Sequence, residues 1–141
     1  MKYKTWKALE KKHPELITLR SSRVWPKPDI HQGWLDLVDE LMTELKKDGL
    51  PDTFSVEQVK EKFGGLRFYC SNVPKNGWDI IRKYEEKSFQ ICEKCGNPGT
   101  PNDVGWIKTL CPVCRKWEND KLTEGQKELM KRMEEELKAR K

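Results

Sequence analysis

The sequence of 141 residues predicts a small, single α+β domain, with a β-hairpin or short sheet packed on helices. Three observations carry this prediction. A strongly amphipathic helical segment occupies about residues 33–47, and residues 53–70 alternate apolar and polar side chains around Gly64-Gly65. Two Cys-x-x-Cys pairs then lie within residues 91–114 and predict a ribbon integrated into the domain.

The composition indicates a modest core. Hydrophobic residues make up 35% of the chain and charged residues 36%, against about 25% charged residues in typical soluble domains. A core of this kind benefits from a cross-link or a bound metal. We divide the chain into a basic N-terminal arm (1–30), an α+β core (31–117) with the ribbon at 89–117, and a charged C-terminal helix (118–141).

The net charge of +5 is concentrated near the N-terminus. Residues 1–30 carry eight Lys or Arg and three Asp or Glu, whereas residues 31–60 carry three and seven. A positive segment favours anionic partners such as nucleic acid, nucleotides or phospholipid, and the alternative is an ordinary solvated surface. The candidate nucleic-acid contacts in this arm are Lys4, Lys7, Lys11, Lys12, Arg20 and Arg23.

No apolar run in the sequence is long enough to span a bilayer, and the N-terminal residues lack the apolar stretch of a signal peptide. We therefore expect a cytoplasmic protein without a membrane partner. In a reducing compartment, paired cysteines are typical of metal sites rather than of disulfides.

Residues 1–12 predict a short basic helix. His13-Pro14 ends it, because the residue before a proline is pushed out of the helical region. Residues 21–30 contain two prolines and predict an extended segment that is anchored by Val24, Trp25 and Ile30.

The clearest helix lies at about residues 33–47. Acidic residues cluster toward its start and Lys46-Lys47 lie in its last turn, which suits the helix dipole. Gly49 is the natural stop. The broad apolar face of this helix comprises Trp34, Leu35, Leu37, Val38, Leu41, Met42 and Leu45.

Residues 53–70 allow two interpretations. In the first, they form a hairpin that turns at Gly64-Gly65. In the second, Ser55 caps a short helix over residues 55–63, and only the following segment is a strand. We favour the hairpin, because the second strand needs a partner close by. The inward residues of that strand would be Leu66, Phe68 and Cys70.

Two further helices are predicted. One spans residues 78–88, and the other begins at a capping box from Thr123 to Gln126 and continues to the end of the chain. The buried face of the first would comprise Trp78, Ile80, Ile81 and Tyr84. A narrow apolar stripe on the second is made by Leu129, Met133 and Leu137. A helix with so narrow a stripe packs on the domain, pairs with a second copy in a homodimer, or frays.

The two cysteine pairs are separated by fifteen residues, 96–110, which is a zinc-ribbon spacing. Two residues between ligands let one tight turn aim both thiolates at a single ion, and the intervening hairpin returns the second pair to complete a tetrahedron. Gly96 suits the first turn, because glycine tolerates a positive φ. Iron, two disulfides and a redox-active pair are the alternatives. We predict one structural Zn²⁺ per chain, held by Cys92, Cys95, Cys111 and Cys114.

The predicted metal site is closed. A catalytic zinc keeps an open position for water and usually has His or carboxylate ligands, whereas four cysteines fill every position here. His13 and His31 are distant in sequence, and Cys70 falls on the apolar face of its strand as a buried thiol. The sequence contains no recognised catalytic motif, so an enzyme is the weakest functional class.

The segment KEKFGGLRFY, residues 60–69, concentrates groups that bind phosphates and bases. The alternative is a plain turn, a core strand and a surface arginine. Trp106, in the second arm of the ribbon, either packs on the preceding helix or stands exposed as a stacking platform, and we favour packing. The candidate ligand-binding residues are Lys60, Lys62, Arg67 and Tyr69.

The motifs VKEKFGGLRFY, CEKCGNPG and GWIKTLCPVC, in this order, resemble those of a group of small uncharacterised proteins of tailed phages and bacteria. The resemblance covers about residues 33–114 and implies a short α+β domain that ends in a zinc knuckle. It carries no function of its own. The phage context implies one of two functions, that of a DNA-associated accessory protein or that of a protein that counters host defence.

Two functional hypotheses remain from the sequence. The first is a non-enzymatic, zinc-containing binding protein, phage-encoded and acting in the host cytoplasm, which sequesters or inhibits a host protein or a signalling nucleotide through residues 60–69. The second is a nucleic-acid-binding zinc-ribbon protein that uses the basic arm and the lysines of the ribbon.

Overall fold

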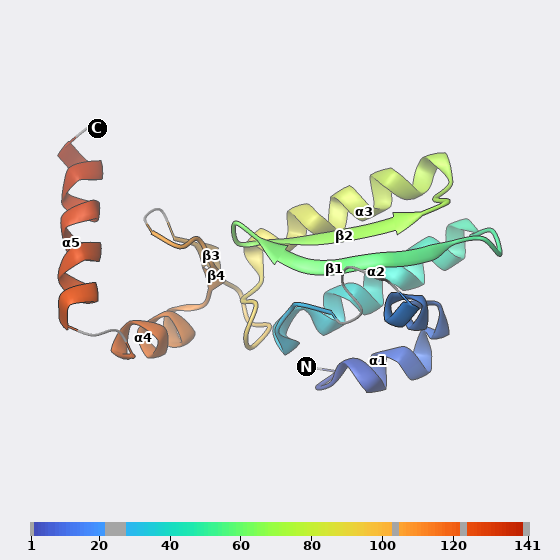
Figure 1. Cartoon of the computed structure of the whole chain (residues 1–141), viewed down its shortest axis with the longest axis horizontal. Coiled ribbons are helices and arrows are strands. Elements are labelled where there is room, and N and C mark those ends of the chain that lie inside the picture. Colours follow the sequence, from blue (N-terminus) through green and yellow to red (C-terminus); the bar gives the residue numbers. More distant parts are fainter. Residues whose placement is uncertain (1, 22–27, 103–104, 122–123, 140–141) are drawn as a thin grey trace.

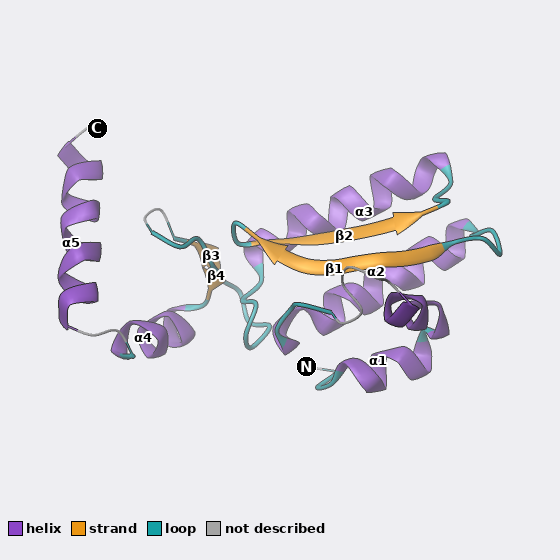
Figure 2. Cartoon of the chain, viewed as in Figure 1, coloured by secondary structure: helices purple, strands orange, loops and turns teal. Residues whose placement is uncertain are grey.

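The computed structural model describes residues 2–21, 28–102, 105–121 and 124–139, without the side chains of 18–21. It is a small α+β domain in which a hairpin lies across two helices, while the ribbon and the last two helices extend to one side (Figure 1; Figure 2). The elements are α1 (Trp6–Lys12), η1 (Pro14–Ser21), η2 (Gln32–Trp34), α2 (Leu35–Asp48), β1 (Ser55–Lys62), β2 (Gly65–Ser71), α3 (Lys75–Lys87), η3 (Ser88–Gln90), β3 (Thr100–Pro101), β4 (Thr109–Leu110), α4 (Pro112–Asp120) and α5 (Glu124–Ala139).

Helix α2 is the centre of the core. All seven residues of its predicted apolar face are buried, and they join the inward side chains of the hairpin in one cluster. The helix ends at Gly49 as predicted, with a φ of 102° and an N–H that bonds to the carbonyls of Leu45 and Lys46. This one face supplies seven of the sixteen buried residues that the structure describes in that cluster.

The predicted hairpin is confirmed, and the helical alternative for residues 55–63 is wrong. Strands β1 and β2 pair antiparallel, but the turn lies one residue earlier than Gly64-Gly65. Its two central residues are Phe63 (φ 53°) and Gly64 (φ 82°), because Lys62 pairs with Gly65. Two positive φ values are typical of a type I′ turn, whose twist matches that of the strands.

The two edges of the hairpin are both covered. Asp29 bridges to β1 on one edge. On the other edge, the N–H of Leu66 donates to Ser88 Oγ at 2.8 Å, and the N–H of Phe68 donates to Glu85 at 3.0 Å. The C-terminal end of α3 therefore supplies hydrogen-bond acceptors where a third strand would otherwise stand.

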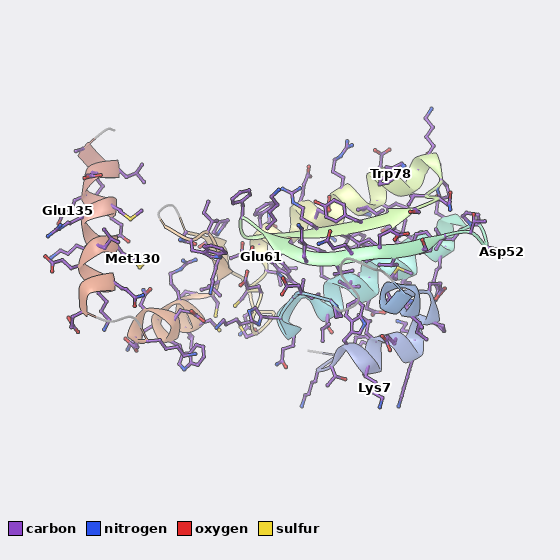
Figure 3. All side chains as sticks on the ribbon, in the orientation of Figure 1. Lys7, Asp52, Glu61, Trp78, Met130 and Glu135 are labelled. Atoms are coloured by element: carbon purple, nitrogen blue, oxygen red, sulfur yellow. The ribbon has the colours of Figure 1, made fainter. Side chains whose placement is uncertain are left out.

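Helix α3 buries a narrower face than predicted. Ile81 and Tyr84 are buried, whereas Trp78 is 48% exposed at the outer end of the helix (Figure 3), so its assignment to the buried face is wrong. The helix approaches α2 at Gly77, where a Cβ would lie 3.3 Å from the side chain of Leu45. Because successive residues of a helix are rotated by about 100° around its axis, Trp78 points away from the contact that Gly77 makes.

The N-terminal segment belongs to the same core. Leu9 of α1 and Leu16 of η1 are fully buried beside α2, and α1 ends at His13 as predicted. Ile30 packs against this core. Val24 and Trp25, the other predicted anchors, lie outside the described residues.

A buried polar network joins the N-terminal segment to α2. His13 is 1% exposed; its Nε2 lies 2.7 Å from Asp39 Oδ1 and its Nδ1 lies 3.0 Å from Lys46 Nζ. Because an ammonium only donates, Nδ1 accepts and the neutral ring donates from Nε2 to Asp39. Lys12 also contacts Asp39 at 2.8 Å, and Glu15 contacts Lys46 at 3.2 Å.

This network makes His13 a pH-sensitive element of stability. Burial lowers the pKa of His13 below its usual 6.5, and the charge of Lys46 lowers it further, although the hydrogen bond to Asp39 acts in the opposite direction. The unfolded chain therefore binds the proton more readily, so that stability is lost as the pH falls below about 6.5.

We predict that NMR titration of the His13 ring gives a pKa below 6.5, with the proton on Nε2 in the neutral form. A His13→Gln variant should be less stable at pH 7 and should lose less stability than the wild type between about pH 6.5 and 5.5. His31→Gln, which removes the other histidine, identifies the ring signals of His13 in the titration. A His13 pKa above 6.5 would contradict the prediction.

Candidate functional site

The four paired cysteines come together in one cluster. Their sulfur atoms all lie within 4.8 Å of one another, and Cys92 and Cys111 are buried. A tetrahedron of Zn–S bonds of about 2.3 Å has edges of about 3.8 Å, and the sulfurs of Cys95 and Cys111 are 3.5 Å apart. The cluster is thus the right size for one tetrahedral metal ion.

The first pair lies on a tight turn after η3. The N–H of Cys92 donates to the carbonyl of Asn97 at 2.7 Å, and the N–H of Gly96 donates to the carbonyl of Cys92 at 2.9 Å. Gly96 has a φ of 83°, the left-handed conformation predicted for it. This backbone arrangement turns both side chains toward the second pair.

The second pair lies at the start of α4. Cys111 caps this helix, and its sulfur accepts from the N–H of Cys114 at 3.4 Å, while Pro112 occupies the first helical turn. That hydrogen bond is the main cause that lowers the pKa of Cys111 to about 7. The helix start therefore favours the thiolate form of Cys111, whereas burial raises the pKa of Cys114 in the same turn.

Basic side chains surround the cluster. Lys94 and Lys108 both pair with Glu118 of α4, the latter at 3.5 Å. Arg115 donates to the carbonyls of Thr100 and Leu110, which closes the ribbon over the second pair. These cations lie in position to offset the formal charge of −2 that four thiolates leave around a divalent ion.

The ribbon is joined to the core by backbone contacts. The N–H of Gly33 donates to the carbonyl of Glu93 at 3.0 Å, and a Cβ on Gly33 would lie 2.3 Å from the carbonyl oxygen of Cys92. Trp34 Nε1 donates to the carbonyl of Ile91 at 2.9 Å. The centre of the core and the first cysteine turn are therefore in direct contact.

A second contact joins the ribbon to the tip of the hairpin. Thr109 Oγ1 donates to the carbonyl of Gly64 at 2.6 Å. A Cβ on Gly64 would lie 3.0 Å from the side chain of Ile107, so the positive φ and the close approach both favour glycine there. Figure 3 shows Glu61 at this junction.

Trp106 does not take part in this joint. The expectation that it packs on the preceding helix is wrong, because its side chain is 79% exposed. The ribbon strands are two residues long, so Trp106 lies in the loop beyond them. Asn102 braces this loop: its side chain donates to the carbonyl of Trp106 at 3.0 Å and accepts from the N–H of Lys108 at 2.6 Å.

The candidate ligand-binding residues share the polar face of the hairpin. Lys60 and Arg67 are cross-strand partners, and Tyr69 pairs with Gln58. Lys60 Nζ lies 5.8 Å from the centre of the Tyr69 ring. Lys62 lies at the end of the same face, next to a Phe63 ring that is 65% exposed. The hairpin thus brings together the four residues singled out from the sequence.

Two polar atoms on this hairpin face are buried without a hydrogen-bond partner, Arg67 Nε and Gln58 Nε2. An unsatisfied buried donor costs on the order of 1–3 kcal/mol. Glu57, the acidic residue on this side, already accepts from the hydroxyls of Ser55 and Ser71 at 2.6 and 3.0 Å. The face therefore presents the positive charge of Lys60, Lys62 and Arg67, whereas the two unpartnered donor atoms lie beneath its surface.

The basic arm is arranged differently. Lys4, Lys7 and Lys11 are exposed, and Lys7 points away from the hairpin in Figure 3, whereas Lys12 is held by Asp39. The side chain of Arg20 and the whole of Arg23 lie outside the described residues. The described lysines of the arm thus do not join the hairpin face.

Glu93 is a buried acid that sequence analysis did not single out. It is 2% exposed, and its Oε2 has no hydrogen-bond partner. Burial raises the pKa of Glu93 to about 7; the charge of Glu61 raises it further, and Lys108 opposes them. Nothing in the Cys-Glu-Lys-Cys motif distinguishes this residue, because its burial results from the distant contact with Gly33.

No protein-family model matches the chain, and neither a curated protein nor a solved structure is significantly similar to it. Within the described part of the chain, helices that combine the length and the apolar character needed to cross a bilayer are absent.

The joint between ribbon and core gives a direct prediction. Gly33→Ala places a Cβ against the backbone of Cys92 and Glu93, and we expect it to destabilise the protein by about 1–3 kcal/mol. Gly125→Ala, in α5 where a Cβ meets nothing within 4 Å, is the matched control and should not destabilise. Thermal unfolding with bound metal compares the two, and equal melting temperatures would contradict this role for Gly33.

Proposed function

We propose that the chain is a non-enzymatic protein that binds single-stranded nucleic acid through the polar face of its hairpin. A structural zinc ion in the ribbon would hold this hairpin in place. The observation that carries the proposal is the gathering of Lys60, Lys62, Arg67 and Tyr69 on a face that no described helix covers (Figure 2). Cations that follow a phosphate backbone, with an aromatic ring on which a base can stack, are typical of single-strand binding.

The shape of the face favours an extended ligand. The four residues lie along two strands, and none of them lines the 490 Å³ cavity found between the ribbon and α5. Small ligands are usually enclosed by concave pockets, whereas single strands lie across a sheet and stack on its rings. Capture of a signalling nucleotide or a host protein remains the second candidate, because it rests on the same residues.

Exposed aromatic residues of the ribbon and α4 extend this argument. Trp106 is 79% exposed and Trp117 is 51% exposed. The ammonium groups of Lys94 and Lys121 lie 4.4 and 3.2 Å from the Trp117 ring. Rings paired with cations offer further stacking positions beyond the hairpin for a longer strand.

For the metal, we propose one Zn²⁺ ion per chain, held by the four cysteines. The donor set is entirely thiolate and leaves no open position for water or substrate, so that its role is to fix the fold. Iron bound by four thiolates would give the protein a visible colour, which zinc does not.

Native mass spectrometry should show one zinc added to the 16.7 kDa chain, and the solution should be colourless. Cys95→Ser should lose the metal and most of the stability, since metal binding and folding are coupled in such ribbons. Cys70→Ser is the matched control, because Cys70 lies outside the cluster, and it should keep its zinc. A coloured, iron-containing protein would overturn the assignment.

Fluorescence anisotropy with a labelled oligonucleotide of about 12 nucleotides tests the proposed function. Tyr69→Ala should raise the dissociation constant about 5- to 150-fold through lost stacking, whereas Tyr69→Phe should keep most of the affinity. Lys62→Ala should reduce the slope of log affinity against log salt by about 0.7.

Lys47→Ala, at the exposed end of α2, and Lys7→Ala, on the side away from the hairpin, are the controls for a general charge effect and should leave the affinity nearly unchanged. Wild-type affinity in both Tyr69→Ala and Lys62→Ala would refute the proposed face. Competition by a mononucleotide as strong as by the oligonucleotide would favour the sequestration hypothesis instead.

A further inference from the structure

Helix α5 carries an apolar stripe that the rest of the described chain leaves uncovered. Leu129 is 57% exposed and Met133 is 36% exposed. In Figure 1 the helix stands apart from the domain, and the 490 Å³ cavity separates Met130 and Leu137 from the ribbon. The stripe is therefore not closed by the ribbon.

The helix has little to stabilise it alone. It is 16 residues long, and its side-chain ion pairs are Lys127 with Glu124 at 4.0 Å and Arg132 with Glu128 at 3.3 Å, all on the exposed surface. Exposed pairs of this kind contribute little, and isolated helices of this length are marginal in water. A partner along the stripe would supply the missing burial.

A partly different set of residues on α5, which shares Met133 and Leu137 with the stripe, has the spacing of a coiled-coil seam. Gln126, Met130, Met133 and Leu137 recur at intervals of four, three and four residues, which places them on one side of the helix. Figure 3 shows Met130 on the side that faces the ribbon and Glu135 on the opposite side. The seam is two heptads long at most, so a second helix of matching length would cover it.

The charges along α5 are ordered. Residues 127–132 contain Lys127, Lys131 and Arg132 against Glu128, a surplus of +2, whereas residues 134–138 contain three Glu against Lys138, a deficit of −2. Two parallel copies would place like charges together. Two antiparallel copies would place the positive half of each helix beside the negative half of the other. Lys127 and Glu134 lie seven residues apart on one flank of the seam, so Lys127 of each copy would meet Glu134 of the other.

We infer that α5 pairs antiparallel with α5 of a second copy, and that the protein is a homodimer through its C-terminal helix. The seam, the length of the helix and its two charge blocks all fit this occupant. The inference does not depend on nucleic-acid binding, and it is tested without a nucleic acid.

Light scattering and sedimentation of the full chain, from about 1 µM to about 1 mM, measure the association expected for a small interface. The mass should rise to twice 16.7 kDa. Met133→Glu places a charge in the middle of the seam and should raise the dissociation constant at least tenfold. Glu135→Gln, on the far side of the helix, is the matched control and should dimerise like the wild type.

A charge exchange tests the orientation. Lys127→Glu and Glu134→Lys should each raise the dissociation constant about threefold or more, and the double variant should return near to the wild-type value. Retained zinc shows that each variant is folded. A chain that stays monomeric at every concentration overturns the inference, and the stripe would then be covered by the ribbon or by another protein. A dimer that Met133→Glu does not weaken also overturns it.

Discussion

The close approach of Gly33 to the first cysteine turn is the constraint on which the structure depends. The ribbon has almost no apolar core of its own, since its buried cluster consists of Cys92, Leu110 and Cys111. So small a unit needs support from its neighbour and from an ion that its four cysteines could hold. The backbone contact at Gly33, with the adjacent bond from Trp34, connects the metal site to the centre of the α2 core.

The same connection orients the hairpin. Its tip is held by Thr109 of the ribbon, one edge by Asp29 and the other by the end of α3. A two-stranded hairpin is marginal alone, but here three contacts fix the direction of its polar face. Side chains on a rigid strand lose less entropy when they bind, so this support matters for any ligand that the face takes.

The parts of the fold that depend on local pattern were predictable from the sequence. The apolar face of α2, the hairpin and the cysteine spacing each reflect a short-range periodicity. The exact position of the turn was not predictable, because both Phe63-Gly64 and Gly64-Gly65 fit a two-residue loop. Tertiary packing decides the register: a Cβ on Gly65 would lie 2.5 Å from the ring of Phe89, so Gly65 belongs in the strand.

Errors arose where a large apolar residue was assumed to be buried. Trp78 and Trp106 are both exposed, and apolar side chains occupy much of any protein surface. The network of His13, Asp39 and Lys46 could not be foreseen either, since it joins residues 26 or more positions apart. For the candidate site, the sequence identified the groups on the hairpin face. It could not show that an irregularity between Val56 and Gln58 and the turn at Phe63-Gly64 align them.

Cys70, the fifth cysteine, packs against the core, and burial raises its pKa to about 12. Since the thiolate is the reactive form, Cys70 is nearly inert toward alkylating reagents at neutral pH. Cys95 and Cys114 are only half-buried, so a bound ion would protect their sulfur atoms from the same reagents. The number of cysteines alkylated per folded chain therefore measures metal occupancy. Cys70 is the internal reference, because it reacts only when the core unfolds.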